Sequence, residues 1–129
     1  KENSILEFSK RVMEEYDVRP RSPQLITSNF SGGNQQKIIL SRELNENPKV
    51  LLVGQPTRGV DIGAIEFIHQ RLIDMRDKGA AILLVSVELE EVLSLSDRIV
   101  VMFDGNIVGE RVNKDVTDRE LGLLMAGVA

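Results

Sequence analysis

Ser31, Gly32 and Gly33 form a short run that could do chemistry, because it stands directly before a stretch of strong helix formers. A helix N-terminus presents backbone N–H groups that have no intrahelical partner, and its dipole favours negative charge. The serine adds a hydroxyl, and the two glycines let an anion approach the backbone closely. This arrangement predicts a phosphate-binding loop. An N-cap followed by a flexible turn explains the same residues and stays open as an alternative.

A second candidate segment begins where a continuous apolar run, residues 50–53, ends in Gly54 and Gln55. Such a run is typical of a central strand that is covered on both faces of a parallel sheet. Ligands of open α/β sheets collect beyond the carboxyl ends of the strands. We therefore expect residues 54–61 to lie near a ligand, together with residues 86–88 after the next strand.

Alternating helical and strand patterns must position these segments. Apolar residues at three- and four-residue steps predict helices, and short apolar runs between turn residues predict strands. The expected helices cover residues 5–16, 35–44, 61–78, 88–95 and 118–126, and the expected strands cover residues 50–53, 81–85, 98–103 and 106–110. Asp104 and Gly105 predict the tight turn of an antiparallel hairpin between the last two strands. The fold class is α/β, with a mostly parallel sheet flanked by helices and a C-terminal hairpin and helix.

Composition excludes several classes of protein for this chain of 129 residues. Its 20 acidic and 16 basic residues give a net charge of −4, which offers no basic surface for nucleic acid. It contains no cysteine, and its single histidine, His69, cannot build a zinc site alone, so no metal site is expected. No apolar run reaches the roughly 18 residues that a membrane-spanning helix needs.

The order of these motifs resembles the second half of an ABC transporter ATPase domain. Residues 31–37 read Ser-Gly-Gly-Asn-Gln-Gln-Lys and are similar to its signature loop, and residues 50–57 are similar to its Walker B strand. The Thr-Arg-Gly-Val-Asp run at residues 57–61 places Asp61 where the family has the aspartate of its D-loop. Together these runs resemble the second ATPase domain of subunits that drive ribose, galactose and nucleoside importers. The Gln-Pro-Thr form favours the nucleoside branch.

The resemblance implies one partial domain with a P-loop NTPase fold. Residues 1–30 would be the remainder of the helical subdomain, and residues 31–129 the signature helix and the C-terminal part of the ATPase core. No Gly-x-x-x-x-Gly-Lys-Ser/Thr motif occurs in the sequence, so the Walker A half that cradles the phosphates is missing. We therefore expect the chain to be a C-terminal excision from a longer subunit.

The resemblance also assigns site residues. Those expected to contact nucleotide are Ser31, Gly32, Gly33, Asn34, Gln35 and Asp61. Gly54 replaces the aspartate that directs magnesium, Gln55 the glutamate that activates water, and Val87 the switch histidine, so no catalytic set is intact. A plain packing role for Gly54 and Val87 stays open.

The resemblance therefore implies two unequal ATP sites. The signature loop of this chain completes the ATP site of a partner domain, and the site on this chain's own Walker B strand is degenerate. ATP and Mg²⁺ are expected in the full-length assembly, with no tight binding or hydrolysis by the fragment alone. Expected partners are an ATPase domain in the same polypeptide, transmembrane permease subunits and, indirectly, a solute-binding protein, at the cytoplasmic face of the cell membrane. Two alternatives remain: an ABC-fold ATPase without a transport role, and a non-enzymatic α/β interaction domain.

Overall fold

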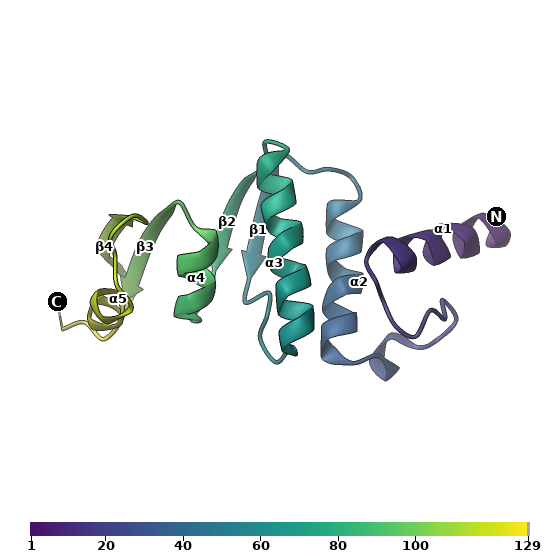
Figure 1. The fold of residues 1–129 in the computed structure, drawn as a ribbon, viewed down its shortest axis with the longest axis horizontal. Helices are drawn as coiled ribbons and strands as arrows, with labels where there is room; N and C mark the ends of the chain where they lie inside the picture. The colour runs from purple at the N-terminus through teal and green to yellow at the C-terminus, as the bar shows by residue number, and fades with distance from the viewer. Residues whose placement is uncertain (129) are drawn as a thin grey trace. The chain divides into compact units, whose positions relative to one another are not determined.

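A computed structural model describes residues 1–128 of the chain (Figure 1). The helices are α1 (Glu2–Glu15), a 3-10 turn η1 (Thr27–Asn29), α2 (Gly32–Leu44), α3 (Ile62–Asp77), α4 (Leu89–Leu95) and α5 (Asp118–Met125), and the strands are β1 (Val50–Gly54), β2 (Ala81–Val85), β3 (Arg98–Phe103) and β4 (Asn106–Val112). The chain divides into two compact units, one comprising Lys1–Leu83 and one that begins at Leu84. All the expected elements are therefore present.

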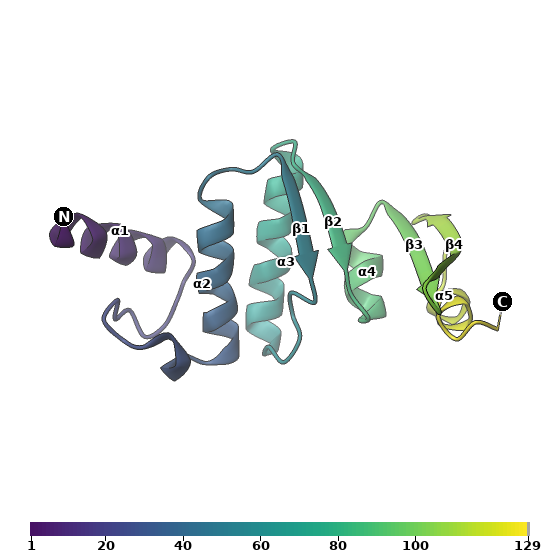
Figure 2. The ribbon, with the colours of Figure 1, turned by 180° about the vertical axis from the view of Figure 1, so that it is seen from behind.

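In the first unit, α2 and α3 lie side by side, as both Figure 1 and Figure 2 show. Asp61 is the N-cap of helix α3, and its side chain accepts a hydrogen bond from the Ala64 N–H and so caps the first turn. Ile68 and Leu72 are buried along one face of this helix. The helix ends before Gly79, whose φ of 96° lies in the left-handed region that favours glycine.

Strands β1 and β2 pair with each other and run in the same direction (Figure 2). Our expectation that residues 50–53 are buried on both faces is wrong for the described chain. Leu51 is buried, but Val50 and Leu52 are 66% and 76% exposed. Successive side chains of a strand point to opposite faces, and the described elements bury only the face that carries Leu51.

Helix α1 keeps only part of its expected apolar face inside. Met13 and Tyr16 are buried at its C-terminal end, whereas Ile5 and Phe8 are exposed. The first turns of α1 extend away from α2 and α3, with the last turn nearest to them (Figure 1). The periodicity therefore predicted the helix correctly, but packing reaches only its last turns.

The second unit is built on an antiparallel hairpin of β3 and β4, in which Val100 is opposite Glu110 and Val101 is opposite Gly109. Asp104 and Gly105 both have positive φ, as the expected tight turn requires. The buried core of this unit consists of Ile99, Val101, Leu121 and Leu124. Among residues 1–128, no helix is both long and apolar enough to cross a membrane.

Candidate functional site

The Ser31 loop lies at the N-terminus of α2, which begins at Gly32 and thus three residues before the expected start. The Ser31 Oγ atom accepts hydrogen bonds from the Asn34 N–H at 3.4 Å and from Asn34 Nδ2 at 2.9 Å. Ser31 and Gly32 are exposed, and Gly33 is buried. The Ser31 hydroxyl and the exposed first residue of a helix thirteen residues long, Gly32, are therefore open to an anion.

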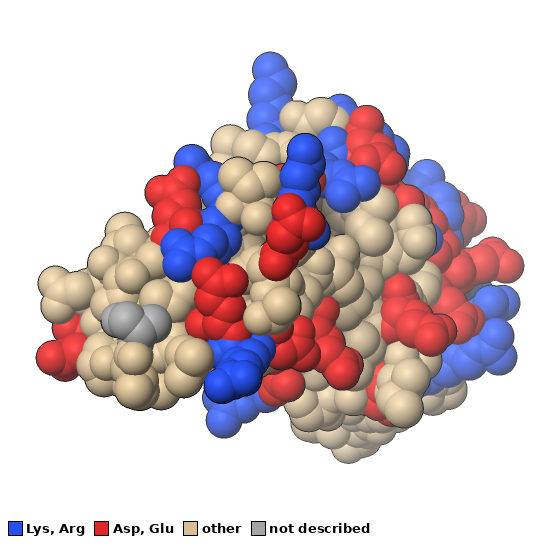
Figure 3. Space-filling model, turned by 60° about the vertical axis from the view of Figure 1, so that its left-hand side comes forward, with Lys and Arg blue, Asp and Glu red and all other residues tan. Residues whose placement is uncertain are grey.

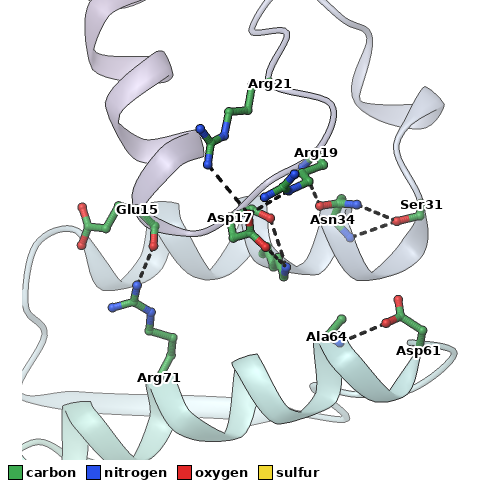
Figure 4. A network of polar contacts seen from close by, with 10 residues as sticks. Glu15, Asp17, Arg19, Arg21, Ser31, Asn34, Asp61, Ala64 and Arg71 are labelled. Atoms are coloured by element: carbon green, nitrogen blue, oxygen red, sulfur yellow. Dashed lines mark hydrogen bonds and ion pairs between the residues drawn. The ribbon is translucent and has the colours of Figure 1, made fainter.

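Asp61 lies beside this loop. A Cβ atom placed on Gly33 would come within 2.8 Å of Asp61 Oδ2 and 2.7 Å of the Ala64 Cβ atom. Ser31 and Asp61 thus stand at the same end of α2 and α3 (Figure 4). Only a residue without a side chain allows the two helix N-termini to approach this closely.

The segment before Asp61 also touches the loop. A Cβ atom on Gly32 would lie 3.3 Å from the carbonyl oxygen of Gly59, whose φ is 70°. The structure therefore brings Asp61 next to the first turn of α2, which holds the other five residues that the sequence assigned to nucleotide.

Two of the assigned residues, Asn34 and Gln35, bond to the protein itself. Gln35 Nε2 donates to the carbonyl oxygen of Phe30 at 2.8 Å. The Oδ1 atom of Asn34 accepts the Arg19 N–H at 2.8 Å, in addition to the bond from Asn34 Nδ2 to Ser31. These side chains hold the loop and the residues before it in place.

Gly54 and Gln55 end β1 without a carboxylate. Gly54 is exposed, and a Cβ atom placed on it would meet no atom within 4 Å. Gln55 has a φ of 49°, which is uncommon for a residue with a side chain. Among residues 1–128, no group of three histidine, cysteine, aspartate or glutamate side chains is placed to hold a metal ion. The residues at this strand end do not fit Mg²⁺, which prefers carboxylate oxygens.

Gln36 joins the two candidate segments, and sequence reasoning missed it. Its Nε2 atom donates to the carbonyl oxygen of Pro56 at 2.9 Å, in a part-buried contact. Pro56 directly follows Gln55, so α2 is bonded to the segment that follows β1. Only the helical spacing from Gly32 to Gln36, about one turn, hints at this in the sequence.

Val87 belongs to the second unit, where it is 61% exposed between β2 and α4. The Ser86 Oγ atom next to it accepts the Glu88 N–H at 3.0 Å and shapes this turn. The side chain of Val87 offers neither a proton donor nor an acceptor.

A group of charged residues beside α2 was also missed. Asp17 accepts from Arg19 Nε at 2.9 Å, and Lys37 Nζ donates to the Asp17 carbonyl oxygen at 3.1 Å and lies 3.6 Å from its carboxylate (Figure 4). The hydrogen bond from Arg19, and the positive charges of Arg19 and Lys37, lower the pKa of Asp17. Lys37 also stands 4.7 Å above the ring of Phe67. Its ammonium group is thus engaged within the protein.

The wider surface mixes both signs of charge. Figure 3 shows lysine and arginine side chains interspersed with aspartate and glutamate side chains, with no continuous basic surface on the face drawn. That face therefore offers an anion no broad basic surface.

Curated relatives match almost the whole chain. It is 51% identical to the nucleoside import ATP-binding protein NupA of Lactococcus lactis subsp. cremoris. The match spans 125 residues, which are 97% of this chain and 25% of that protein. It is 51% identical over 119 residues to the guanosine import ATP-binding protein NupO of Bacillus subtilis, 92% of this chain and 23% of that protein. A ribose import ATP-binding protein, RbsA of Bacillus licheniformis, is 39% identical over 94% of this chain and 24% of its own length. The chain thus spans about a quarter of the length of these relatives.

No family model matches the chain. Solved structures show its fold. The ATP-binding cassette MJ1267 of an ABC transporter superimposes with a TM-score of 0.70 at 24% identity, over 97% of this chain and 48% of that one. The dimeric cassette MJ0796 bound to ADP and Pi gives a TM-score of 0.70 at 23% identity, over 82% of this chain and 46% of that one. The fold is that of an ABC ATPase cassette, of which the chain covers about half.

Proposed function

We infer that the chain belongs to the ATP-binding proteins of ABC importers for simple sugars and nucleosides, because the sequence match covers nearly all of it and its fold is an ABC ATPase cassette. ATP and Mg²⁺ are accordingly used by the full-length protein.

We propose that the Ser31 loop completes an ATP site whose phosphate-binding loop lies on a partner ATPase domain. The observation that carries this proposal is the exposed N-terminus of α2, where a hydroxyl and backbone N–H groups stand together. Terminal phosphate oxygens are acceptors that such a group of donors can bind. Gly32 and Gly33 keep the approach free of side chains and pack against Gly59 and Asp61.

The site built on the end of β1 holds nucleotide without efficient hydrolysis. Gly54 has no side chain to orient a magnesium ion, and the amide of Gln55 cannot take a proton from water. The exposed Val87 likewise lacks a proton donor or acceptor. Hydrolysis is therefore assigned to the site that the Ser31 loop completes.

The proposed partners are a second ATPase domain in the same polypeptide, transmembrane permease subunits and, indirectly, a solute-binding protein. Closure of the two ATPase domains on ATP and their reopening after hydrolysis would move the permease between its two faces. The subunit would act at the cytoplasmic face of the membrane. The two relatives at 51% identity, one for nucleosides and one for guanosine, support a nucleoside as the imported solute.

Vanadate mapping tests whether the Ser31 loop reaches the transferred phosphate. The full-length subunit, assembled with its permease, is trapped with MgADP and orthovanadate and then irradiated, which cleaves the backbone at a serine beside the vanadate. We expect a cut at Ser31, found by peptide mass spectrometry, and its loss in Ser31→Ala. A trapped complex that is cut at the partner's phosphate-binding loop but never at Ser31 would overturn the proposal.

A further inference from the structure

Asn34 connects the Ser31 hydroxyl to a segment far away in the sequence. Its Oδ1 atom accepts the backbone N–H of Arg19 at 2.8 Å, and its Nδ2 atom donates to Ser31 Oγ at 2.9 Å (Figure 4). The backbone N–H of Asn34 adds a longer bond of 3.4 Å to the same oxygen. A single side chain thus has one fixed partner on each side.

The chemistry of these partners decides the direction of every hydrogen bond in the chain of contacts. A backbone N–H can only donate, so the amide oxygen of Asn34 must face Arg19 and the amide nitrogen must face Ser31. The Ser31 oxygen must then accept. A hydroxyl has two acceptor positions and one donor, and Asn34 fills the acceptor positions. The Ser31 hydrogen is therefore left to donate to a ligand.

The backbone N–H of Arg19 is the first donor in this series of hydrogen bonds, and its segment is itself held in place. Arg19 Nε donates to the carboxylate of Asp17 at 2.9 Å, and Lys37 Nζ donates to the Asp17 carbonyl oxygen at 3.1 Å. Lys37 lies on α2, three residues after Asn34 and on the same side of the helix. The segment 17–19 is thus bonded to the first turns of α2 at two points.

We propose that Asn34 is a positioning residue that makes the Ser31 hydroxyl a hydrogen-bond donor, so that the loop selects a ligand atom that only accepts. An unprotonated oxygen of a terminal phosphate is such an atom. The proposal rests on the function proposed above for the Ser31 loop, and it gives Asn34 a role that acts through Ser31 instead of through direct contact with nucleotide.

A double-mutant cycle tests this role in the full-length subunit assembled with its permease. Ser31→Ala, Asn34→Ala and the double variant are compared by the ATP concentration that half-saturates turnover and by the affinity for a non-hydrolysable ATP analogue. Ser31→Ala should weaken the analogue about tenfold or more, as expected for a hydrogen bond to a charged acceptor. Asn34→Ala should weaken it in the same direction, and the double variant should be no weaker than Ser31→Ala alone.

Two contrary outcomes can be told apart. If the losses from Ser31→Ala and Asn34→Ala multiply in the double variant, Asn34 does not act through the hydroxyl and the inference is wrong while the proposed function stands. If Ser31→Ala changes neither quantity, the proposed function of the loop fails, and the inference fails with it.

Asn34→Asp gives a sharper test because it changes the direction of bonding with little change in shape. A carboxylate still accepts the Arg19 N–H, but its other oxygen accepts the Ser31 hydrogen and turns that hydrogen away from the ligand. We expect a larger loss of analogue affinity than in Asn34→Ala. Affinity equal to that of the wild type would overturn the proposal.

Matched controls come from the other end of the same helix. Asn45 is the C-cap of α2 and lies about three turns from Asn34. Asn45→Ala and Asn45→Asp should leave analogue affinity within about twofold of the wild type, because their side chain has no contact with Ser31. Thermal unfolding of each variant establishes that any loss at Asn34 occurs in a folded protein.

Discussion

Gly33 lies so close to Asp61 that a Cβ atom on Gly33 would come within 2.8 Å of the Asp61 Oδ2 atom. The carboxylate of Asp61 also caps α3 through its Oδ1 atom, 3.0 Å from the Ala64 nitrogen. The first turn of α2 and the start of α3 are therefore packed as one piece. A side chain at position 33 would therefore push against Asp61 and the start of α3.

Gly33→Ala should disrupt this contact. The new methyl group meets the Ala64 Cβ atom at 2.7 Å as well as Asp61, so the two helices must separate. We expect a loss of about 1–3 kcal/mol in the free energy of unfolding, measured by denaturant titration. Gly63→Ala is the matched control, because its nearest contact is an ordinary 3.5 Å, and it should be neutral or slightly stabilising.

Gln36→Ala should loosen the link between α2 and the segment that follows β1. It removes the donor to the Pro56 carbonyl oxygen in a part-buried contact, which costs about 1–2 kcal/mol of unfolding free energy. Gln70→Ala, which removes an exposed side-chain contact to Asp74, should cost less than about 0.5 kcal/mol. Equal losses of unfolding free energy in the two variants would show that the bond to Pro56 stabilises the fold no more than an exposed side-chain contact does.

Tyr16 should release its phenolic proton only above its ordinary pKa. Burial is the main reason that its pKa is raised, and the charge of Glu15 adds to this while Arg71 opposes it. The stabilisation linked to Tyr16 is thus complete below the unfolded pKa of about 10 and is lost as pH rises through the folded pKa. Tyr16 is the only tyrosine and no tryptophan is present, so phenolate absorbance of the 129-residue chain reports this group alone. A midpoint at or below that of the unfolded chain would contradict its burial.

Placing carboxylates at the end of β1 should create a magnesium site there. Gly54 has open space where a side chain would stand, so Gly54→Asp fits without displacing a neighbour. We expect Gly54→Asp with Gln55→Glu to raise ATP hydrolysis by the full-length subunit severalfold, with Gly54→Asp with Gln55→Ala as the control that lacks a base. Unchanged hydrolysis would contradict the prediction that carboxylates at these two positions are sufficient for activity at the end of β1.

The sequence predicted the helices and strands well because each has its own local signals. Asp61 as a cap and Asp104-Gly105 as a turn mark element boundaries that the structure confirms. The exposure of Leu52 was not predictable in the same way, since an apolar run indicates burial without saying which neighbouring segments supply it.

The candidate site likewise has one part that local sequence signals predict and one part that depends on packing. The phosphate binding that we propose for the Ser31 loop rests on residue types at a helix start, which a sequence displays. The bonds from Asn34 to Arg19 and from Gln36 to Pro56 join segments 15 and 20 residues apart. No local pattern specifies such pairs, because they depend on how the helices pack.

Steady-state ATP hydrolysis by the full-length subunit with its permease tests the asymmetric account most directly, by comparing Gly32→Asp with Gln55→Ala. A carboxylate at Gly32 should repel a terminal phosphate, whereas Gln55 contributes no base. We expect Gly32→Asp to abolish turnover and Gln55→Ala to change it less than about twofold, with Gly122→Asp, which has open space for its side chain, as the control for the added charge. If Gln55→Ala abolishes turnover and Gly32→Asp does not, hydrolysis occurs at the end of β1 and the account is wrong.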